Sequence, residues 1–220
     1  MSDIKLYDAI VVVTPKDFKR VESNNKRIVE YLPVRKVLFV GSKELGELVE
    51  QSSFGDKAGF VDENDIIPFD DVYNCLKDIM ADILLGRELP RGLVGWYYQQ
   101  FLKLQYVRMC KDEYYMSWDG DTVPCKNFSM FSDDGRPYFD LKHEFHQEYF
   151  ITMNKLLPNL DKTIDKSFIS EHMIFNCKYL VKMLEDIESN ENIEGVTFWE
   201  KILHSIRLEH VQENLSLIHI

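Results

Sequence analysis

Two short stretches of the chain are apolar without interruption, and the segment between them has a helical period. Residues Ala9 to Val13 and Lys36 to Val40 ("KVLFV") are rich in the β-branched side chains that favour strands. Between them, apolar side chains in residues 14–33 recur every three or four positions. Strands without polar alternation are typical of a parallel sheet that is covered on both faces. The pattern therefore predicts a right-handed strand–helix–strand unit in such a sheet.

The predicted helix has a start signal and a stop signal. Thr14 can cap its amino end, Pro15 occupies the first helical position, and Asp17 places a negative charge near the positive end of the helix dipole. Pro33 ends the run. The apolar residues that fall near one face of this helix are Phe18, Val21, Ile28, Val29 and Leu32.

Strands and helices continue to alternate further along the chain. A turn-rich stretch with three glycines and a proline spans residues 86–95, and we expect it to precede a helix. Further strands are predicted within residues 59–69, 114–118 and 173–175, and helices over about 71–85, 96–110, 144–157, 176–188 and 198–211. This alternation predicts an α/β fold, with a mixed, mostly parallel sheet flanked by helices.

Length and charge narrow the class of protein. A chain of 220 residues with 45% hydrophobic composition can build one substantial core, so we expect a single domain. The formal net charge is -11, which is unsuited to neutralising a nucleic-acid backbone. A phosphate-containing ligand would therefore be bound locally, through a metal or a few donors.

The cysteines and the hydropathy suggest a compartment. Cys75, Cys110, Cys125 and Cys177 are far apart and form no CxxC pair, and no apolar leader follows Met1. No stretch reaches the roughly 18 continuous apolar residues of a membrane span. We expect a reduced, cytoplasmic protein, for which peripheral association with the inner face of a membrane stays open.

The segment "YYMSWDGDTVP" places two carboxylates directly after a predicted buried strand. Ligands of open α/β sheets bind beyond the carboxyl ends of the strands, where Asp119 and Asp121 lie. In extended backbone, residues two apart point the same way, and Gly120 would let backbone approach closely. Carboxylate oxygens suit Mg²⁺ or Mn²⁺. Asp-Gly is also a strong hairpin signal, so pattern alone leaves a metal site and a turn equally open.

An ordered set of segments resembles one enzyme family. The strand–helix–strand unit, "VDEND", "GWYYQQFLKL", "YYMSWDGDTVP" and "SFISEHMIF" follow one another as in bacterial GT-A-type glycosyltransferases of polysaccharide biosynthesis. The resemblance covers the chain to about residue 210. It implies a GT-A-like, Rossmann-like fold, a nucleotide-sugar donor, and a cell-surface glycan or lipid-linked acceptor. It also implies that Asp121 is a direct ligand of Mn²⁺ or Mg²⁺, and that Asp119 contacts the ribose, or the metal through water.

Further site residues are expected around the same strand end. His172 is a candidate third metal ligand, with a hydrogen-bonded or surface histidine as the alternative. Glu171 is a candidate base for an acceptor hydroxyl, with a solvated loop carboxylate as the alternative. Gln100 and Lys103, with the neighbouring Gln99, could reach the donor from the preceding helix or simply form its polar edge.

Thr14 is expected to cap its helix, and the resemblance adds a contact with the nucleotide. Asp62 and Glu63 are expected at a strand end near the cleft, where solvation explains them equally well.

The end of the chain departs from the resemblance. The tail "NLSLIHI" looks like translated adapter sequence, and a Ser-Glu-Tyr-Glu segment of the similar proteins is missing. We therefore expect one domain over residues 1–214, incomplete at its carboxyl end, and a non-native tail over residues 215–220.

Two other functions stay open from the sequence. One is a nucleotidyltransferase-like enzyme, which is disfavoured because no Gly-rich phosphate loop follows the first strand. The other is a non-catalytic nucleotide-binding or interaction module.

Overall fold

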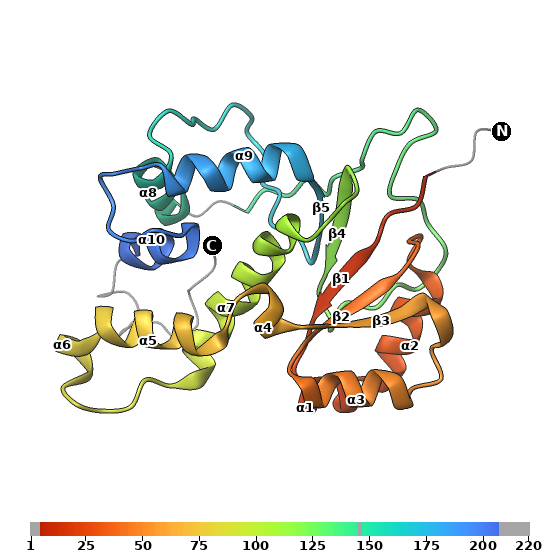
Figure 1. The fold of residues 1–220 in the computed structure, drawn as a ribbon. Coiled ribbons are helices and arrows are strands. Elements are labelled where there is room, and N and C mark those ends of the chain that lie inside the picture. Colours follow the sequence, from red (N-terminus) through yellow and green to blue (C-terminus); the bar gives the residue numbers. More distant parts are fainter. Residues whose placement is uncertain (1–4, 145–146, 207–220) are drawn as a thin grey trace.

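A five-stranded sheet forms the centre of the protein (Figure 1). The computed structural model describes residues 5–144 and 147–206. The strand order is β3-β2-β1-β4-β5, and the strands are β1 (Ala9–Val12), β2 (Val37–Gly41), β3 (Ala58–Asp62), β4 (Tyr114–Trp118) and β5 (His172–Asn176). Every neighbouring pair is parallel except β4 with β5, which is antiparallel. The predicted mixed, mostly parallel sheet is therefore confirmed.

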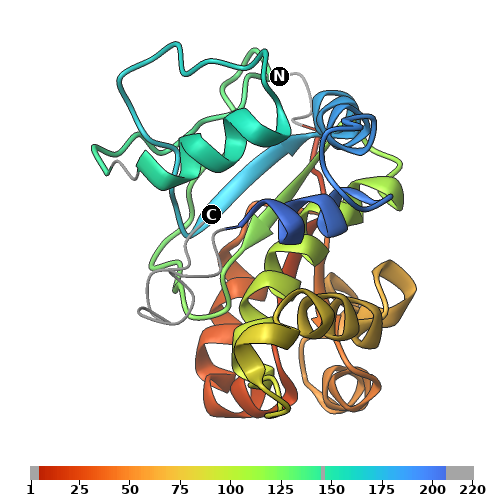
Figure 2. The same ribbon diagram turned by 90° about the vertical axis from the view of Figure 1, so that its left-hand side faces the viewer.

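Helices cover both faces of this sheet (Figures 1 and 2). The α-helices are α1 (Pro15–Arg20), α2 (Glu22–Tyr31), α3 (Lys43–Gln51), α4 (Glu63–Ile66), α5 (Phe69–Ile79), α6 (Ala81–Leu84), α7 (Arg91–Gln105), α8 (Gln147–Leu156), α9 (Cys177–Glu188) and α10 (Phe198–Ser205). Short 3-10 helices, η1 (Gly55–Lys57) and η2 (Tyr106–Arg108), join some of them.

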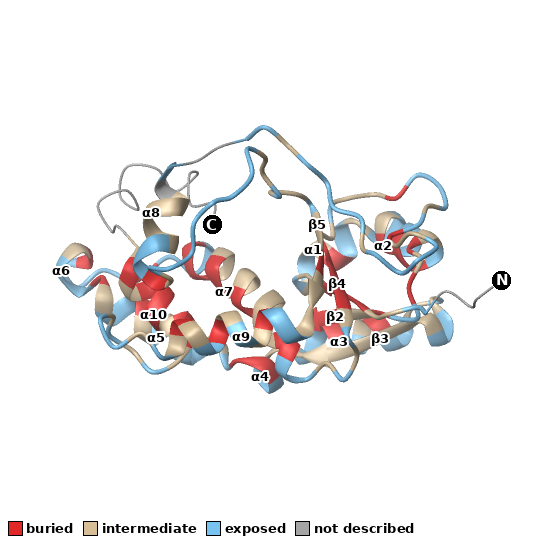
Figure 3. Cartoon of the chain, turned by 90° about the horizontal axis from the view of Figure 1, so that it is seen from above, coloured by how far each residue is buried: buried red, intermediate tan, exposed pale blue. Residues whose placement is uncertain are grey.

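The two faces of the sheet have separate apolar cores. Ala9 and Val11 pack with α1, α2 and α3 on one face, whereas Ile10 packs with α5, α7, α9 and α10 on the other. The alternation follows from the two-residue period of a strand, and burial on both faces explains why β1 contains no polar residue. Buried side chains accordingly concentrate along the sheet and α7 (Figure 3). Strand β4 is thus an interior strand, as predicted.

The first predicted helix is wrong in one respect, because it is divided into α1 and α2 at Val21. Val21 has φ -116° and ψ 36°, outside helical geometry. The fully buried Asn25 donates a side-chain hydrogen bond of 2.8 Å to the carbonyl of Phe18, a group freed where α1 ends. The predicted cap is confirmed, since the backbone N–H of Asp17 donates to Oγ1 of Thr14 at 3.1 Å.

Other boundaries shift for local reasons. Helix α7 begins at Arg91 and contains Gly92 and Gly95, so the turn-rich stretch is shorter than expected. The helix expected over 71–85 begins at Phe69 and is interrupted at Met80. The part of the last helix expected beyond residue 206, and the tail over residues 215–220, lie outside the described residues.

Among the helices in the described part of the chain, none is long and apolar enough to cross a membrane.

Candidate functional site

The strand order reverses between β1 and β4. From β1 the chain proceeds outward to β2 and β3, and it then returns to β4 on the opposite side of β1. Such a switch point leaves a crevice beyond the carboxyl ends of the two strands, and ligands of open α/β sheets bind there. Thr14 follows β1 and Asp119 follows β4 directly. The sheet topology thus brings two predicted site residues to the usual ligand-binding edge.

The Asp-Gly-Asp segment forms a tight turn that leads away from the sheet. The backbone N–H of Thr122 donates to the carbonyl of Asp119 at 3.0 Å, and the indole N–H of Trp118 donates to the carbonyl of Thr122 at 2.8 Å. The chain returns along β4 only as β5 (His172–Asn176), after α8 and a long connection, so a tight hairpin at the Asp-Gly-Asp turn is excluded. The expectation of extended backbone at this point was also wrong.

The role predicted for Gly120 also changes. A Cβ atom at Gly120 would come no closer than 3.5 Å to its neighbours, the side chains of Val11 and Val13. Packing in this structure therefore does not require a glycine at the turn.

A cavity of about 900 Å³ lies at the switch point, and we call it the switch-point cavity. Asp119 and Asp121 both line it, so the two residues lie at one cavity although the backbone between them forms a turn. Its polar lining also includes Thr14, Asp17, Arg20, Ser42, Glu63, Asn64, Asp70, Arg91 and Gln99. The hydroxyl of Thr14 is already engaged, because it donates to Oδ2 of Asp17 at 2.8 Å. Thr14 therefore shapes this wall of the cavity as a helix cap.

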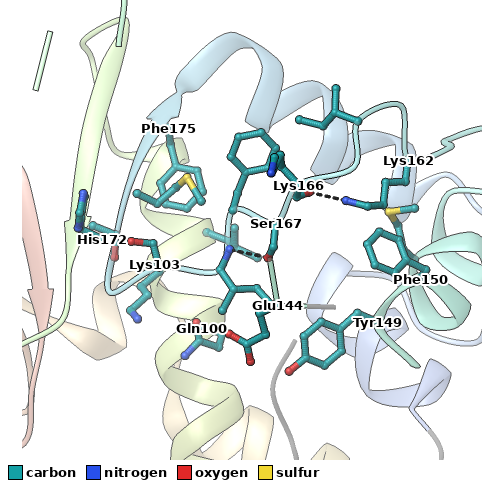
Figure 4. A pocket seen from close by; sticks show the side chains of 18 of the residues that line it. Gln100, Lys103, Glu144, Tyr149, Phe150, Lys162, Lys166, Ser167, His172 and Phe175 are labelled. Atoms are coloured by element: carbon teal, nitrogen blue, oxygen red, sulfur yellow. Dashed lines mark hydrogen bonds between the residues drawn. The ribbon is translucent and has the colours of Figure 1, made fainter. Parts of the chain in front are cut away.

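A second cavity, of about 620 Å³, lies on the other side of Asp119 and is called here the β5 cavity (Figure 4). Gln100, Lys103, Glu171 and His172 line it together with Asp119. Gln99 and Gln100 were predicted as one group, but they divide between the two cavities because neighbours on a helix point in different directions. Asp119 lines both cavities, so ligands in the two would meet at its carboxylate.

Lys103 fixes the position of Asp119. Its Nζ lies 2.6 Å from Oδ1 of Asp119, and the two side chains are 12% and 32% exposed. Helix α7 supplies the lysine, and the hydroxyl of Tyr115 donates to the backbone carbonyl of Lys103 at 2.5 Å. Asp121, in contrast, is exposed and makes no hydrogen bond or ion pair with any residue that the structure describes. One carboxylate is thus held in place and the other is available to a ligand.

The carboxylates suit a hard divalent cation. Mg²⁺ usually takes one or two carboxylates and completes its shell with water and substrate phosphates. The second oxygen of Asp119 and the carboxylate of Asp121 provide such donors at the switch-point cavity. Within residues 5–144 and 147–206, no group of three or more His, Cys, Asp or Glu side chains has a metal-binding arrangement. The remaining ligands of a bound ion would therefore come largely from substrate and water.

His172 has other contacts in this structure. Its ring stacks on Trp118 with 5.0 Å between the ring centroids, and its Nε2 lies 3.8 Å from Oδ2 of Asp140. It lines the β5 cavity, so its role as a metal ligand stays a prediction.

Glu171 lies beside the Asp-Gly-Asp turn through its backbone. The N–H of Asp119 donates to the carbonyl of Glu171 at 2.9 Å, which continues the β4–β5 pairing. The Glu171 carboxylate is exposed and pairs with Nζ of Lys142 at 2.9 Å. A hydrogen bond from its own backbone and the one from Lys142 lower the pKa of Glu171. The side chain is therefore an ionised acceptor of protons near neutral pH.

Several charged residues in and around the site were not predicted, among them Arg91 and Lys142. Arg91 lines the switch-point cavity, with its guanidinium carbon 4.5 Å from the ring centroid of Phe69. It was missed because residues 86–95 were interpreted as a loop. Lys142 pairs with Glu171 from 29 positions away, and nothing in the local sequence indicates that pair.

Comparison with known protein families shows which family the chain belongs to. The family described as "Family of unknown function (DUF6492)" matches residues 3–213. The chain belongs to the DUF6492 family. No curated protein matches this DUF6492 chain in sequence.

Solved structures with a related arrangement include glycosyltransferases. The galactosyltransferase LgtC in complex with donor and acceptor sugar analogs is 13% identical, with 90% of the DUF6492 chain and 69% of LgtC covered and a TM-score of 0.47. An active-site mutant of LgtC is 12% identical at the same coverage, with a TM-score of 0.42. The apo-form glycosyltransferase GlyE of Streptococcus pneumoniae is 10% identical, with 90% and 42% covered and a TM-score of 0.39. With TM-scores below 0.5, these likenesses do not assign an activity to the DUF6492 chain.

Proposed function

We propose that this protein is a metal-dependent glycosyltransferase that moves a sugar from a nucleotide-sugar donor to a hydroxyl of a cell-surface glycan or lipid-linked acceptor. The observation that carries the proposal is the position of Asp119, which lines two cavities at once. A two-substrate transfer needs donor and acceptor sites that meet at one point, so that the reacting atoms are held in reach of each other. The resemblance of the ordered sequence segments to GT-A-type glycosyltransferases supports the same reaction.

The switch-point cavity is the proposed donor site. Its volume of about 900 Å³ suits a nucleotide sugar, and it lies where α/β sheets bind nucleotides. Arg91 offers a cation for the diphosphate. A divalent ion held by Asp119 and Asp121 would act as a Lewis acid on the departing diphosphate. This local arrangement lets a protein of net charge -11 bind a strongly anionic donor.

The chain's own residues supply positioning and a proton acceptor. Lys103 holds Asp119 at the boundary of the two cavities. The acceptor oxygen forms a bond to the anomeric carbon, the bond from that carbon to the diphosphate oxygen breaks, and the nucleoside diphosphate leaves. The hydroxyl proton passes to the Glu171 carboxylate, which lines the β5 cavity and is ionised at neutral pH.

The direct test is consumption of a donor. The protein is incubated with UDP-, GDP-, CDP- and ADP-sugars in the presence of Mn²⁺, and products are separated by chromatography with and without added acceptor sugars. Release of one nucleoside diphosphate, lost in Asp121→Asn, is expected. Asp56→Asn is the matched control, because Asp56 is also exposed but lies before β3, outside both cavities. Release of a nucleoside monophosphate, or no consumption of any donor by the folded protein, would contradict the proposal.

A further inference from the structure

Apolar side chains contribute most of the surface of the β5 cavity, and polar residues line it at several points along its length. Lys103 and His172 lie at the end nearest the Asp-Gly-Asp turn, and Tyr149 and Phe150 of α8 lie across the cavity from them (Figure 4). The other polar lining residues are Gln100, Ser117, Asp119, Glu144, Asp161, Lys162, Thr163, Lys166, Ser167, Ser170 and Glu171. The other apolar lining residues are Leu104, Met153, Leu160, Ile164, Phe168, Ile169, Met173 and Phe175. Binding sites for free sugars need hydrogen-bonding groups along the ligand, since burying an unpaired hydroxyl is costly. The mostly apolar surface therefore suits a ligand whose far part is hydrocarbon.

The mouth of the cavity is an apolar rim that is open to solvent. Three residues that line the cavity, Leu160, Ile164 and Phe168, are 47%, 46% and 40% exposed. They belong to the loop between α8 and β5, which forms one side of the molecule together with α8 (Figure 2). We call these three residues the rim.

A second segment extends the same apolar surface. The backbones of Lys142 and Ser167 exchange two hydrogen bonds of 2.9 Å, which hold the segment before residue 142 beside the rim loop. Phe139 packs against Phe168 with 5.8 Å between ring centroids. Tyr138, Phe139 and Leu141 are also exposed, so these two segments carry six of the eleven large exposed hydrophobic residues in the described part of the chain. Such a concentration marks a binding surface for an apolar partner.

The lysine nearest the aromatic end does not face the cavity as an open cation. Nζ of Lys162 donates to the backbone carbonyl of Lys166 within its own loop. It also lies 5.4 Å from the ring centroid of Phe150. The ammonium group thus closes the loop over the apolar lining.

From this mostly apolar surface and the open rim we infer that the acceptor is an amphiphile: its hydroxyl group lies at Asp119, and its hydrocarbon chain follows the β5 cavity and leaves across the rim. The inference rests on the proposed function, because it names the acceptor of that reaction. The apolar surface of the cavity favours the lipid-linked acceptor over the glycan. The exposed rim and the neighbouring Tyr138, Phe139 and Leu141 form the surface over which the chain leaves.

Binding is tested without any donor. Octyl β-D-glucoside, below its critical micelle concentration, and methyl β-D-glucoside share one head group and are titrated into the protein by calorimetry at several temperatures. Affinity should rise about fourfold for each methylene that the cavity buries, so the octyl compound should bind at least tenfold more tightly than the methyl compound. Binding of the octyl compound should also have a negative heat-capacity change.

Variants locate the chain. Ile164→Ser and Phe168→Ser should each weaken octyl glucoside binding about tenfold or more. Val196→Ser and Tyr179→Ser are the controls, because both residues are exposed hydrophobics outside the β5 cavity. Equal affinity for the two glucosides, unchanged affinity in both rim variants, or self-association through the rim that octyl glucoside does not reduce, would each overturn the inference.

The transfer assay separates this inference from the proposed function. Once the donor is known, kcat/KM is compared for the octyl and methyl glucosides. Binding of octyl glucoside at the rim without consumption of any nucleotide sugar would refute the glycosyltransferase while leaving the amphiphile site in place. Equal kcat/KM for both acceptors would leave the glycosyltransferase in place and refute the amphiphilic acceptor.

Discussion

The ammonium group of Lys103 lies 2.6 Å from Oδ1 of Asp119 and thereby ties α7 to the end of β4. Helix α7 also packs directly on β1, the other strand of the switch point. The pair orients the one carboxylate that lines both cavities.

Replacing this lysine should damage the reaction more than the fold. We expect Lys103→Met to lower kcat/KM roughly 10- to 100-fold and to raise the Mn²⁺ concentration needed for half-maximal activity, because outer-shell partners of metal ligands have effects of this size. Lys182→Met is the matched control, since Lys182 pairs with Asp186 on the exposed side of α9. An unchanged metal dependence in Lys103→Met would show that the pair does not position a metal ligand.

The role of His172 can be separated from its stacking on Trp118. His172→Phe keeps an aromatic ring on the indole but removes the nitrogen that could bind a metal. We expect this variant to keep the melting temperature and to need about tenfold more Mn²⁺ for half-maximal activity. If Mn²⁺ dependence is unchanged and only His172→Ala lowers the melting temperature, His172 is a packing residue.

The proton acceptor predicts a pH effect with a definite sign. Hydrogen bonds from its own backbone and from Lys142 lower the pKa of Glu171, so the carboxylate stays ionised to lower pH than an ordinary glutamate. Lys142→Gln removes one of these causes and should move the acidic limb of the kcat profile to higher pH. Glu171→Gln should abolish most turnover while donor affinity is kept. An acidic limb that does not move in Lys142→Gln would remove Glu171 from the mechanism.

The pKa of Glu63 is raised, whereas that of Glu171 is lowered, and this predicts an effect of pH on stability. Burial and the nearby charge of Asp62 raise its pKa, while Arg91 opposes the shift. The folded protein therefore holds the Glu63 proton more tightly than the unfolded chain, and stability falls as pH rises from the unfolded pKa through the folded one. Glu63→Gln should raise the free energy of unfolding at pH 7, and the gain should shrink below about pH 4.3, the ordinary pKa of glutamate. Urea unfolding at pH 7 and below about pH 4.3 measures this gain in the free energy of unfolding. A Glu63→Gln variant that is less stable than the parent protein at pH 7 would contradict the predicted sign.

The sequence was sufficient for the sheet and for the position of the carboxylates. Uninterrupted apolar runs such as Ala9 to Val12 have no alternative to burial on both faces, and the cap at Thr14 follows from local hydrogen-bonding chemistry. The Asp-Gly-Asp segment follows β4 directly, so its place at the strand ends could be predicted from the chain alone.

Side-chain contacts between distant segments could not be predicted in the same way. The pair of Lys142 with Glu171 depends on two loops meeting. The break at Val21 is a more local case, because the buried Asn25 bonds to Phe18 across it, and the helical period alone does not indicate that contact. The division of Gln99 and Gln100 between two cavities requires knowing which neighbours α7 has on each side. A sequence pattern gives the period of a helix, whereas tertiary packing decides what each face meets.

The most direct measurement is the melting temperature with UDP, GDP, CDP and ADP, each with and without Mn²⁺, on the protein and on its Asp121→Asn and Asp56→Asn variants. A ligand at 100 times its Kd stabilises the native state by ~2.7 kcal/mol, which corresponds to a rise of roughly 5–10 °C for a chain of this size. The account predicts such a rise with one nucleotide, only with Mn²⁺, in the protein and in Asp56→Asn but not in Asp121→Asn. A rise that does not need Mn²⁺ or survives Asp121→Asn, or no rise with any nucleotide, would contradict a metal-dependent donor site at the switch point.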